Sequence, residues 1–472
     1  MGGLKYMILN RYISLAAALG LTVVTVATGW ADEVDDLVRA EMKRQQIPGC
    51  AIAVVRDGQV VKAAAYGVAN AESGAPVTTD TLFRIQSVSK QFTAAGVMLL
   101  VEEGKLGLDD PVGRHLEGIP PAWAKLTIRH LLTQTSGLPD FVNESLVDLR
   151  ADHTEEQLLA AIAGRPLKFV PGEAWAYSNS NYHLLAMIIR RVTGRWYGDF
   201  LAERIFQPIG MTRTTVLQTG ETDHDVAVGH TLERGRLKGA STVALSVASY
   251  GGGGIRSTIL DLAKWDAVLY TDRLLKQASR ERMWTPAVLN NGTAHGYGFG
   301  WEIGEIAGHR RLAHSGKWLG FSAQIDRFVG DHLTVILLAN QSETNPARIT
   351  RAVAGHYLPG VAVRVYAPIP DTEPEVTARF RDVLRRSASG GLQAEDFTAE
   401  AWPYMEPLLG QLRRDMAVFG ELERLTLLER TEQDGVRHYR YRTRFKRTTL
   451  RYHFALAPDG RIAVMTPEGV NE

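Results

Sequence analysis

The hydrophobic positions near the start of the chain predict a β-hairpin followed by a buried helix. An apolar run, Cys50–Val55, is followed by Asp57-Gly58 and then by a second run, Val60–Ala64. Asp-Gly between two such runs is a strong hairpin signal, because a tight turn requires positive φ at both central residues. From about Ser87 to Gly104 apolar residues recur at helical spacing. They are Phe92, Ala95, Met98, Leu99 and Val101.

The rest of the pattern predicts one antiparallel sheet assembled from distant parts of the chain. Residues 108–284 carry mostly helical periodicity, whereas Phe321–Phe328 and Leu333–Ala339 have strand character and are joined through Gly330-Asp331. Strands at both ends with helices between them indicate an α/β (α+β) unit over residues 32–360, in which helices flank the sheet and form an insertion.

A cluster of prolines marks a boundary after this unit. Four prolines lie between 359 and 374, too many for a helix or a central strand, so residues 361–374 are predicted to be a linker. The remainder, 375–472, has helical stretches and then alternating segments around Asp434-Gly435 and Asp459-Gly460. It is predicted to be a small α+β domain with an antiparallel meander.

The first residues are typical of an export signal. Lys5 and Arg11 precede an uncharged apolar stretch, Ile13–Ala27, and Gly29-Trp30-Ala31 offers small residues at the positions that a signal peptidase inspects. We therefore expect residues 1–31 to be a signal peptide and the protein to be exported, in a bacterium to the periplasm. An uncleaved membrane anchor is the alternative, because the apolar stretch almost reaches the length of a bilayer span.

Composition excludes several function classes. Among 472 residues, 53 Lys and Arg balance 52 Asp and Glu for a net charge of +1, which argues against nucleic-acid binding. The single cysteine, Cys50, excludes an internal disulfide and a Cys-rich metal site, and we expect it to be a small buried hydrophobe. The 13 histidines form no His-Glu-x-x-His motif. No metal or cofactor is expected.

Candidate chemistry begins at Ser87-Val88-Ser89-Lys90, at the start of the apolar helix. Three residues make one helical turn, so the Ser87 hydroxyl and the Lys90 amine share a face. The positive end of the helix dipole favours a developing alkoxide on Ser87. Burial disfavours the ammonium form of a lysine, so that its amine can accept a proton. A helix cap is the simpler interpretation of an isolated Ser87.

Two further elements follow in order. Tyr177-Ser178-Asn179 offers a phenol that a nearby lysine cation would help to ionise and an amide that can pair with a substrate peptide bond. His314-Ser315-Gly316 lies before the Phe321 strand, where a glycine on an edge strand lets a substrate backbone approach closely. Taken alone, each of these two elements is better explained by packing, by loop structure or by an ordinary polar histidine.

The ordered set of three elements resembles the family of class C β-lactamases, serine D-alanyl-D-alanine carboxypeptidases and related family VIII-type esterases. Further matching stretches are Leu131–Pro139, Pro171-Gly172-Glu173 and Gly251–Gly254 followed by Ile255-Arg256-Ser257. The resemblance covers residues 32 to 360 and implies a β-lactamase/transpeptidase-like fold. We expect the glycine run to mark a close backbone approach near the pocket.

The resemblance implies a role for each motif residue. Ser87 would be the acylated nucleophile, Lys90 and Tyr177 its proton-transfer pair, and Asn179 the holder of the substrate amide. His314, Ser315, Gly316 and Lys317 would line the substrate site. The backbone N–H groups of Ser87 and Lys317 would form the oxyanion hole.

One position departs from the β-lactamase pattern. Class C β-lactamases carry Lys-Thr-Gly on the strand, whereas this chain has His314-Ser315-Gly316. Histidine has an ordinary pKa of about 6.5 and is mostly neutral above pH 7, so it anchors an anionic substrate less well than lysine. Lys317 would compensate in part. We therefore expect a serine hydrolase of D-amino-acid peptides or small esters rather than a dedicated β-lactamase.

Two alternatives remain open at this point. One is a class C-like β-lactamase, and the other is a non-catalytic penicillin- or muropeptide-binding sensor. The predicted C-terminal domain carries a strand with one basic face, made by Arg440, Arg442, Arg444 and Lys446. A solvated face is the simpler explanation, and binding of anionic cell-wall material is the sharper one.

Overall fold

The computed structural model describes residues 28–217, 226–233, 235–248, 250–362, 368–433 and 435–470. Most of the predicted signal peptide, residues 1–27, lies outside these ranges, and the first described helix is α1 (Thr28–Gln45). The chain divides into two compact units, Met1–Val363 and Arg364–Glu472. None of the described helices is long and apolar enough to cross a membrane.

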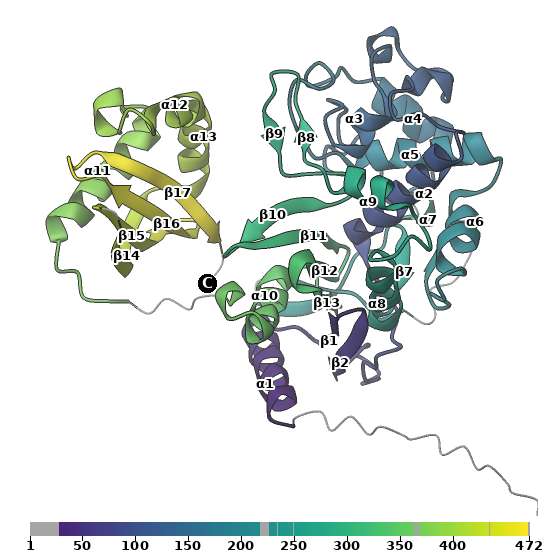
Figure 1. The fold of residues 1–472 in the computed structure, drawn as a ribbon, viewed down its shortest axis with the longest axis horizontal. Helices are drawn as coiled ribbons and strands as arrows, with labels where there is room; N and C mark the ends of the chain where they lie inside the picture. Colours follow the sequence, from purple (N-terminus) through teal and green to yellow (C-terminus); the bar gives the residue numbers. More distant parts are fainter. Residues whose placement is uncertain are drawn as a thin grey trace, which may run out of the picture. The chain divides into compact units, whose positions relative to one another are not determined.

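A six-stranded antiparallel sheet forms the centre of the first unit, as the hydrophobic pattern predicted (Figure 1). Its strand order is β10-β11-β12-β13-β1-β2, so the N-terminal hairpin is completed by strands that are more than 200 residues away. Cys50 pairs with Ala339 in the register that joins the two halves. The strands are β1 (Gly49–Arg56), β2 (Gln59–Gly67), β10 (Glu302–Ile306), β11 (His309–Trp318), β12 (Phe321–Phe328) and β13 (Leu333–Ala339).

Both faces of this sheet are covered by helices, which explains why the central strands β1, β12 and β13 are almost wholly buried. Along β1, alternate residues enter different cores. Cys50, Ile52 and Val54 pack with α1 and α10 (Pro346–Tyr357). Ala51, Ala53 and Val55 face the larger core, which includes α8 (Ile259–Val268). Cys50 is fully buried, as expected.

The larger core continues into the helical region that connects the two halves of the sheet. Its centre is α2 (Lys90–Glu102), which is buried nearly all round, as expected for a helix with apolar residues on every side. Around it lie the helices α3 (Ile128–Leu132), α4 (Glu155–Ala163), α5 (Asn179–Thr193), α6 (Tyr197–Leu201), α7 (Leu245–Ala248) and α9 (Gln277–Met283).

Short strands interrupt this region, which the sequence pattern predicted only as mostly helical. One three-stranded sheet, in the order β3-β7-β4, lies directly before the predicted nucleophile. The short strands are β3 (Phe83–Arg84), β4 (Thr215–Val216), β5 (His230–Glu233), β6 (Arg236–Gly239), β7 (Ile255–Ser257), β8 (Ala287–Val288) and β9 (Ala294–His295).

The second unit is an α+β domain in which helices cover one face of a four-stranded antiparallel meander, as predicted. Phe380 of α11 stacks on Phe454 of β16 and meets Tyr439 and Tyr441 of β15 edge-on. The elements are α11 (Pro374–Ser389), α12 (Trp402–Met405), α13 (Leu409–Phe419), β14 (Leu422–Gln433), β15 (Val436–Phe445), β16 (Thr449–Leu456) and β17 (Ile462–Val470).

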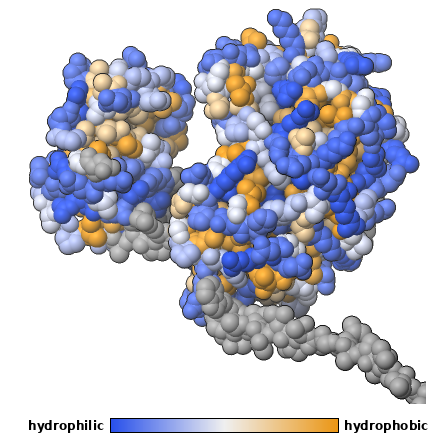
Figure 2. All heavy atoms as spheres, viewed as in Figure 1, coloured by the Kyte–Doolittle hydropathy of each residue, from blue (hydrophilic) through white to orange (hydrophobic). Residues whose placement is uncertain are grey.

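The opposite face of this meander carries the predicted basic stripe. Arg440 and Arg444 alternate with buried residues along β15, but glutamates lie among them. Arg440 pairs with Glu429 and Glu468, and Arg444 pairs with Glu423. The positive charge available to an anionic polymer is therefore smaller than the sequence alone indicates. In the view of Figure 2, hydrophilic residues predominate on both units.

Candidate active site

Ser87 lies in a sharp turn between a strand and a helix. The 3₁₀ segment η1 (Gln86–Ser89) follows β3 and runs directly into α2, so the α-helix begins at Lys90 rather than near Ser87, where it was predicted. Gln86 has a φ of 51°, a left-handed conformation that is unfavourable for a residue with a side chain. Ser87 is half-buried, so its hydroxyl is partly accessible.

Gly316 is required by the close approach of this turn to β11. A Cβ at position 316 would lie 2.2 Å from the carbonyl oxygen of Ile85 and 3.0 Å from the backbone nitrogen of Ser87. The sequence argument attributed the glycine to substrate approach at an edge strand, and the turn adds a second requirement for it. β11 is an interior strand, but β10 pairs only with His309–Ala313, so among the described strands His314–Trp318 has no neighbour on that side.

Lys90 is completely buried and points its amine at Ser87. Its Nζ lies 3.1 Å from Ser87 Oγ, 3.0 Å from Asn179 Oδ1 and 2.8 Å from the carbonyl oxygen of Gly252. Burial lowers the pKa of Lys90 to about 7, and the negative charge of Asp140 opposes this shift. The two carbonyl-type oxygens can only accept hydrogen bonds. A neutral amine therefore donates its two hydrogens to them and directs its lone pair toward the Ser87 hydroxyl.

Tyr177 completes the group, although not as the sequence argument expected. Lys90 Nζ lies 4.8 Å from the centre of its ring, and its hydroxyl hydrogen-bonds to Ser87. Burial raises the pKa of Tyr177, and the hydrogen bond with Ser87 offsets this only in part. The expectation that a lysine cation would promote a phenolate was wrong, because desolvation outweighs it and favours the neutral phenol.

Asn179 is held by protein partners at both ends of its amide. It is the first residue of α5, with 6% of its surface exposed. Its Oδ1 accepts from Lys90 Nζ and, at 3.0 Å, from Tyr250 OH, while its Nδ2 donates to the Asp140 carboxylate at 3.1 and 3.3 Å. The predicted contact with a substrate amide would therefore have to use the second hydrogen of Nδ2.

His314 is buried and neutral. Its Nδ1 lies 2.7 Å from the carbonyl oxygen of Ser315, and its Nε2 lies 3.0 Å from Tyr297 OH. A carbonyl oxygen only accepts, so Nδ1 carries the hydrogen and Nε2 accepts from the tyrosine. Burial and the nearby Lys90 lower the pKa of His314 to about 3. Lys317, by contrast, is exposed at the end of the strand.

The structure thus brings together Ser87, Lys90, Tyr177 and Asn179, with the His314–Lys317 segment beside the turn. Sequence reasoning missed Asp140, Tyr250 and Tyr297. Asp140 directly follows the matched stretch Leu131–Pro139, and Tyr250 directly precedes the glycine run, so their positions beside motifs were the available signal. Nothing in the sequence around Tyr297 indicated its contact with His314.

The glycine run brings the backbone close to the site, as expected. Gly252 supplies the carbonyl that binds Lys90, and a Cβ on this residue would lie 2.5 Å from the Tyr250 ring and 3.0 Å from Lys90 Nζ. A Cβ on Gly251 would lie 2.4 Å from the carbonyl oxygen of Tyr182. These glycines allow the loop to close over the buried amine.

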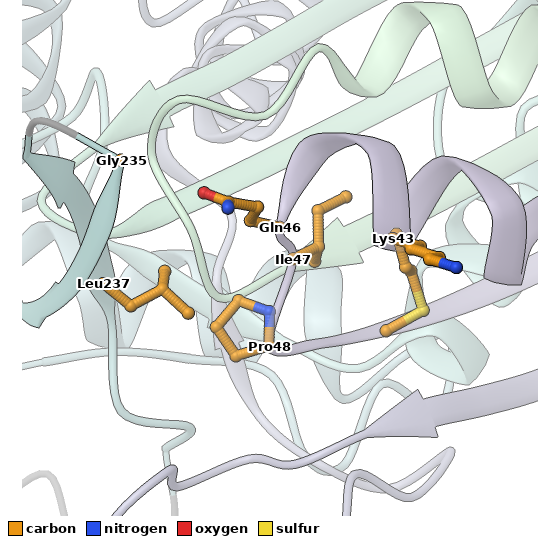
Figure 3. Close-up of a pocket in the computed structure, with 7 residues that line it drawn as sticks. Lys43, Gln46, Ile47, Pro48, Gly235 and Leu237 are labelled. Carbon is orange, nitrogen blue, oxygen red and sulfur yellow. The ribbon is translucent and has the colours of Figure 1, made fainter.

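A small hollow of about 10 Å³ lies next to the nucleophile turn. It is lined in part by Gln86, Gly253, Gly254 and Trp318. A larger pocket of about 410 Å³ lies between the end of α1 and the β5–β6 hairpin, where Ile47, Pro48 and Leu237 line it (Figure 3). It contains none of the predicted site residues. The described residues hold no group of three or more side chains suited to a metal ion.

Known proteins are similar to this chain in sequence and in fold. The profile of the Beta-lactamase family matches residues 34–358. Penicillin-binding protein 4* of Bacillus subtilis is 34% identical over 405 residues, which cover 79% of this chain and 86% of the relative. D-aminopeptidase of Brucella anthropi is 32% identical over 299 residues, which cover 62% of this chain and 56% of that protein.

Solved structures agree with these relatives. The D-amino acid amidase of Ochrobactrum anthropi SV3 matches with a TM-score of 0.59 and 26% identity, over 69% of this chain and 99% of that one. An octameric penicillin-binding protein homologue from Pyrococcus abyssi matches in fold with a TM-score of 0.64 and 24% identity, over 91% of this chain and 96% of that one.

The fold and the family match place the chain among the serine hydrolases with the β-lactamase fold. The chain belongs to the Beta-lactamase family.

Proposed function

We propose that this protein is an acyl-transfer hydrolase that works through an acyl-Ser87 intermediate. The observation that carries the proposal is the buried Lys90 amine, 3.1 Å from Ser87 Oγ, with both of its other positions bound to oxygen acceptors. A serine is a weak nucleophile without a base, and an amine with a pKa of about 7 is largely unprotonated at pH 8.

In the proposed reaction, Ser87 Oγ attacks the substrate carbonyl carbon while Lys90 takes the hydroxyl proton. The bond to the leaving group then breaks, and that group receives the proton from Lys90 through the Tyr177 hydroxyl. Water attacks the acyl-serine ester, its proton passes to Lys90, and the proton returns to Ser87 as the ester bond breaks. The N–H groups of Ser87 and Lys317 would stabilise the oxyanion of each tetrahedral intermediate.

We propose small amides or peptides of D-amino acids and small esters as the substrates, rather than β-lactams as a dedicated function. His314 stands where class C β-lactamases have lysine, and its neutral, buried imidazole supplies no charge for a substrate carboxylate. The names of two similar proteins, a D-aminopeptidase and a D-amino acid amidase, support this substrate class.

Penicillin binding is the second candidate, because one relative is named a penicillin-binding protein. A β-lactam that acylates Ser87 without rapid turnover would fit both that name and the missing lysine. A non-catalytic sensor would react in the same way but would turn over neither ester nor amide.

The test is a time course with a chromogenic short-chain ester, D-alanine p-nitroanilide and a chromogenic cephalosporin. The wild type is expected to turn over the ester or the anilide steadily, with little action on the cephalosporin. Ser87→Ala should abolish this activity. Ser73→Ala is the matched control, because Ser73 is exposed and its hydroxyl only accepts the Ala75 N–H within its own loop.

Each other outcome overturns part of the proposal. Fast cephalosporin turnover would favour the class C-like β-lactamase. A single stoichiometric acylation without turnover of any substrate would favour the non-catalytic sensor. Equal activity of Ser87→Ala and the wild type would show that the assigned site is wrong.

A further inference from the structure

Asp140 is a buried carboxylate behind the site that no motif assigned. It lies in the loop before α4, with 3% of its surface exposed. Its oxygens accept from the backbone nitrogens of Val142 (3.0 Å) and Asn143 (3.3 Å), from Asn143 Nδ2 (2.7 Å) and from Asn179 Nδ2 (3.1 Å). Within the described ranges, no lysine or arginine lies at ion-pair distance from it.

The contact with Asn179 connects this carboxylate to the base. Asn179 Nδ2 binds Asp140, while Oδ1 of the same amide accepts from Lys90 Nζ at 3.0 Å. The Lys90 amine, the Asn179 amide and the Asp140 carboxylate are thus linked by consecutive hydrogen bonds. The bond to Asp140 fixes which end of the amide faces Lys90. Turned over, the amide would set its NH₂ against Lys90 and its oxygen against a carboxylate, which is unfavourable at both ends.

We propose that Asp140 is a positioning residue for the acyl transfer at Ser87: its carboxylate holds Asn179 with Oδ1 toward Lys90 and places a negative charge behind the base. The inference rests on the proposed function, because it concerns the same nucleophile. It adds a residue that acts through Asn179 and through its charge, without touching the reacting atoms.

The other titratable groups that face Lys90 are neutral, so Asp140 supplies the main charge near its amine. Lys90 Nζ lies 4.8 Å from the ring centre of Tyr177 and 5.5 Å from that of Tyr182. Tyr250 donates a hydrogen bond to the same Asn179 oxygen that binds Lys90. Burial raises the pKa of all three phenols, so they are neutral. From β11 comes His314, whose pKa is lowered to about 3, so it is also neutral. The Asp140 charge favours the ammonium form of Lys90.

A purely local role in the loop is the competing explanation. The bonds from Asp140 to the backbone of Val142 and Asn143 make an Asx-type turn, which would stabilise the loop without affecting the site. A loop role predicts lower stability when Asp140 is replaced, but no change in the pH at which Ser87 becomes reactive. This difference separates the two explanations.

The experiment measures the rate at which a fluorophosphonate labels Ser87 in the full chain, from pH 5 to 9, for wild type and Asp140→Asn. Labelling requires the unprotonated base, so it falls on the acid side. Loss of the negative charge disfavours the ammonium, and the acid limb is expected to move about 0.5–1 pH unit lower. Loss of the fixed amide is expected to lower the plateau rate about 10-fold.

Glu144→Gln is the matched control. Glu144 lies in the same loop, accepts from the Asp140 backbone nitrogen at 2.7 Å and pairs with Lys168, but its carboxylate does not bind Asn179. It should keep the wild-type acid limb. If Asp140→Asn does not fold, Asp140→Ser replaces it, because a serine hydroxyl can still cap the turn but cannot reach Asn179.

The outcomes separate the two claims. An acid limb that moves in the Asp140 variant and not in Glu144→Gln supports the inference. An acid limb at the wild-type pH overturns it, whatever happens to the plateau. If the wild type is labelled no faster than Ser87→Ala, the proposed function fails instead.

Discussion

Among the described residues of the first unit, two basic side chains are completely buried, Lys90 and Arg327, and they differ in almost every other respect. Arg327 donates from Nε to Asp266 at 2.5 Å, and its guanidinium faces the rings of Tyr270, Trp284 and Trp301 at 4.7–5.6 Å. Lys90 has no carboxylate in contact. It binds neutral oxygens, and the nearest negative charge, Asp140, is separated from it by Asn179.

The difference shows what makes a buried cation reactive. An arginine does not lose its proton in a protein, and a directly bonded carboxylate and aromatic faces stabilise its charge, so Arg327 is a permanent part of the core. For a lysine surrounded by neutral oxygens, no direct ion pair offsets the cost of desolvating the ammonium form. Its pKa is therefore lowered, to about 7 for Lys90. In the proposed mechanism, Arg327 contributes to the packing of the core, and Lys90 takes part in the chemistry at Ser87.

The largest effect is expected from Lys90→Met, which removes the base and keeps a similar volume. The rate of Ser87 labelling and of ester turnover should fall at least about 10³-fold, because the hydroxyl loses its proton acceptor. Circular dichroism should show a folded protein. A variant that keeps more than a tenth of the wild-type rate would mean that Lys90 is not the base.

Arg327→Met should have the opposite result. It leaves Asp266 buried without its partner, and breaking a buried pair typically costs about 3–5 kcal/mol of unfolding free energy. Labelling of Ser87 per folded molecule should stay near the wild-type rate. Urea titration with a parallel labelling assay measures both quantities. A large loss of labelling in folded protein would place Arg327 in the site and break the comparison.

The pH dependence of stability should distinguish the two cations further. The pKa of Lys90 is lowered on folding, so the unfolded chain binds the proton more tightly and stability rises as the pH increases from about 7 toward 10.5. Lys90→Met should therefore gain most in melting temperature relative to wild type near pH 6, and less at pH 9. A difference that is constant with pH would contradict the lowered pKa.

The smallest effect concerns His314. Its pKa of about 3 keeps the imidazole neutral throughout the range of activity. The ratio of kcat/KM for an anionic and a neutral ester with the same leaving group should be the same at pH 6 and pH 8. A ratio that rises at pH 6 would show that His314 gains a proton and attracts the anion.

Local patterns predicted the N-terminal hairpin, β12 and β13, because these depend on residues that are near one another in the chain, whereas the short strands between residues 83 and 295 were missed. Asp57-Gly58 predicted the hairpin, and the alternation in β15 predicted its buried and charged faces. The spacing of Ser87 and Lys90 predicted their contact, although the turn at Gln86 was missed because its positive φ has no signature in a glutamine.

Long-range polar contacts could not be predicted in this way. Asp140, in the loop before α4, meets Asn179, the first residue of α5, and nothing in either local sequence specifies that contact. The protonation states of the site residues could not be predicted from the sequence either, because they depend on burial. His314 and Tyr177 were expected near their ordinary pKa or below it, and burial moves both groups toward their neutral forms.

The most direct test of the central claim is the pH dependence of kcat/KM for a neutral short-chain ester with the wild-type protein. If the neutral amine of Lys90 activates Ser87, activity should rise tenfold per pH unit on the acid side and level off above a single ionisation near pH 7. A profile that is flat from pH 5 to 8, or that falls as the pH rises, would show that Lys90 is not the base.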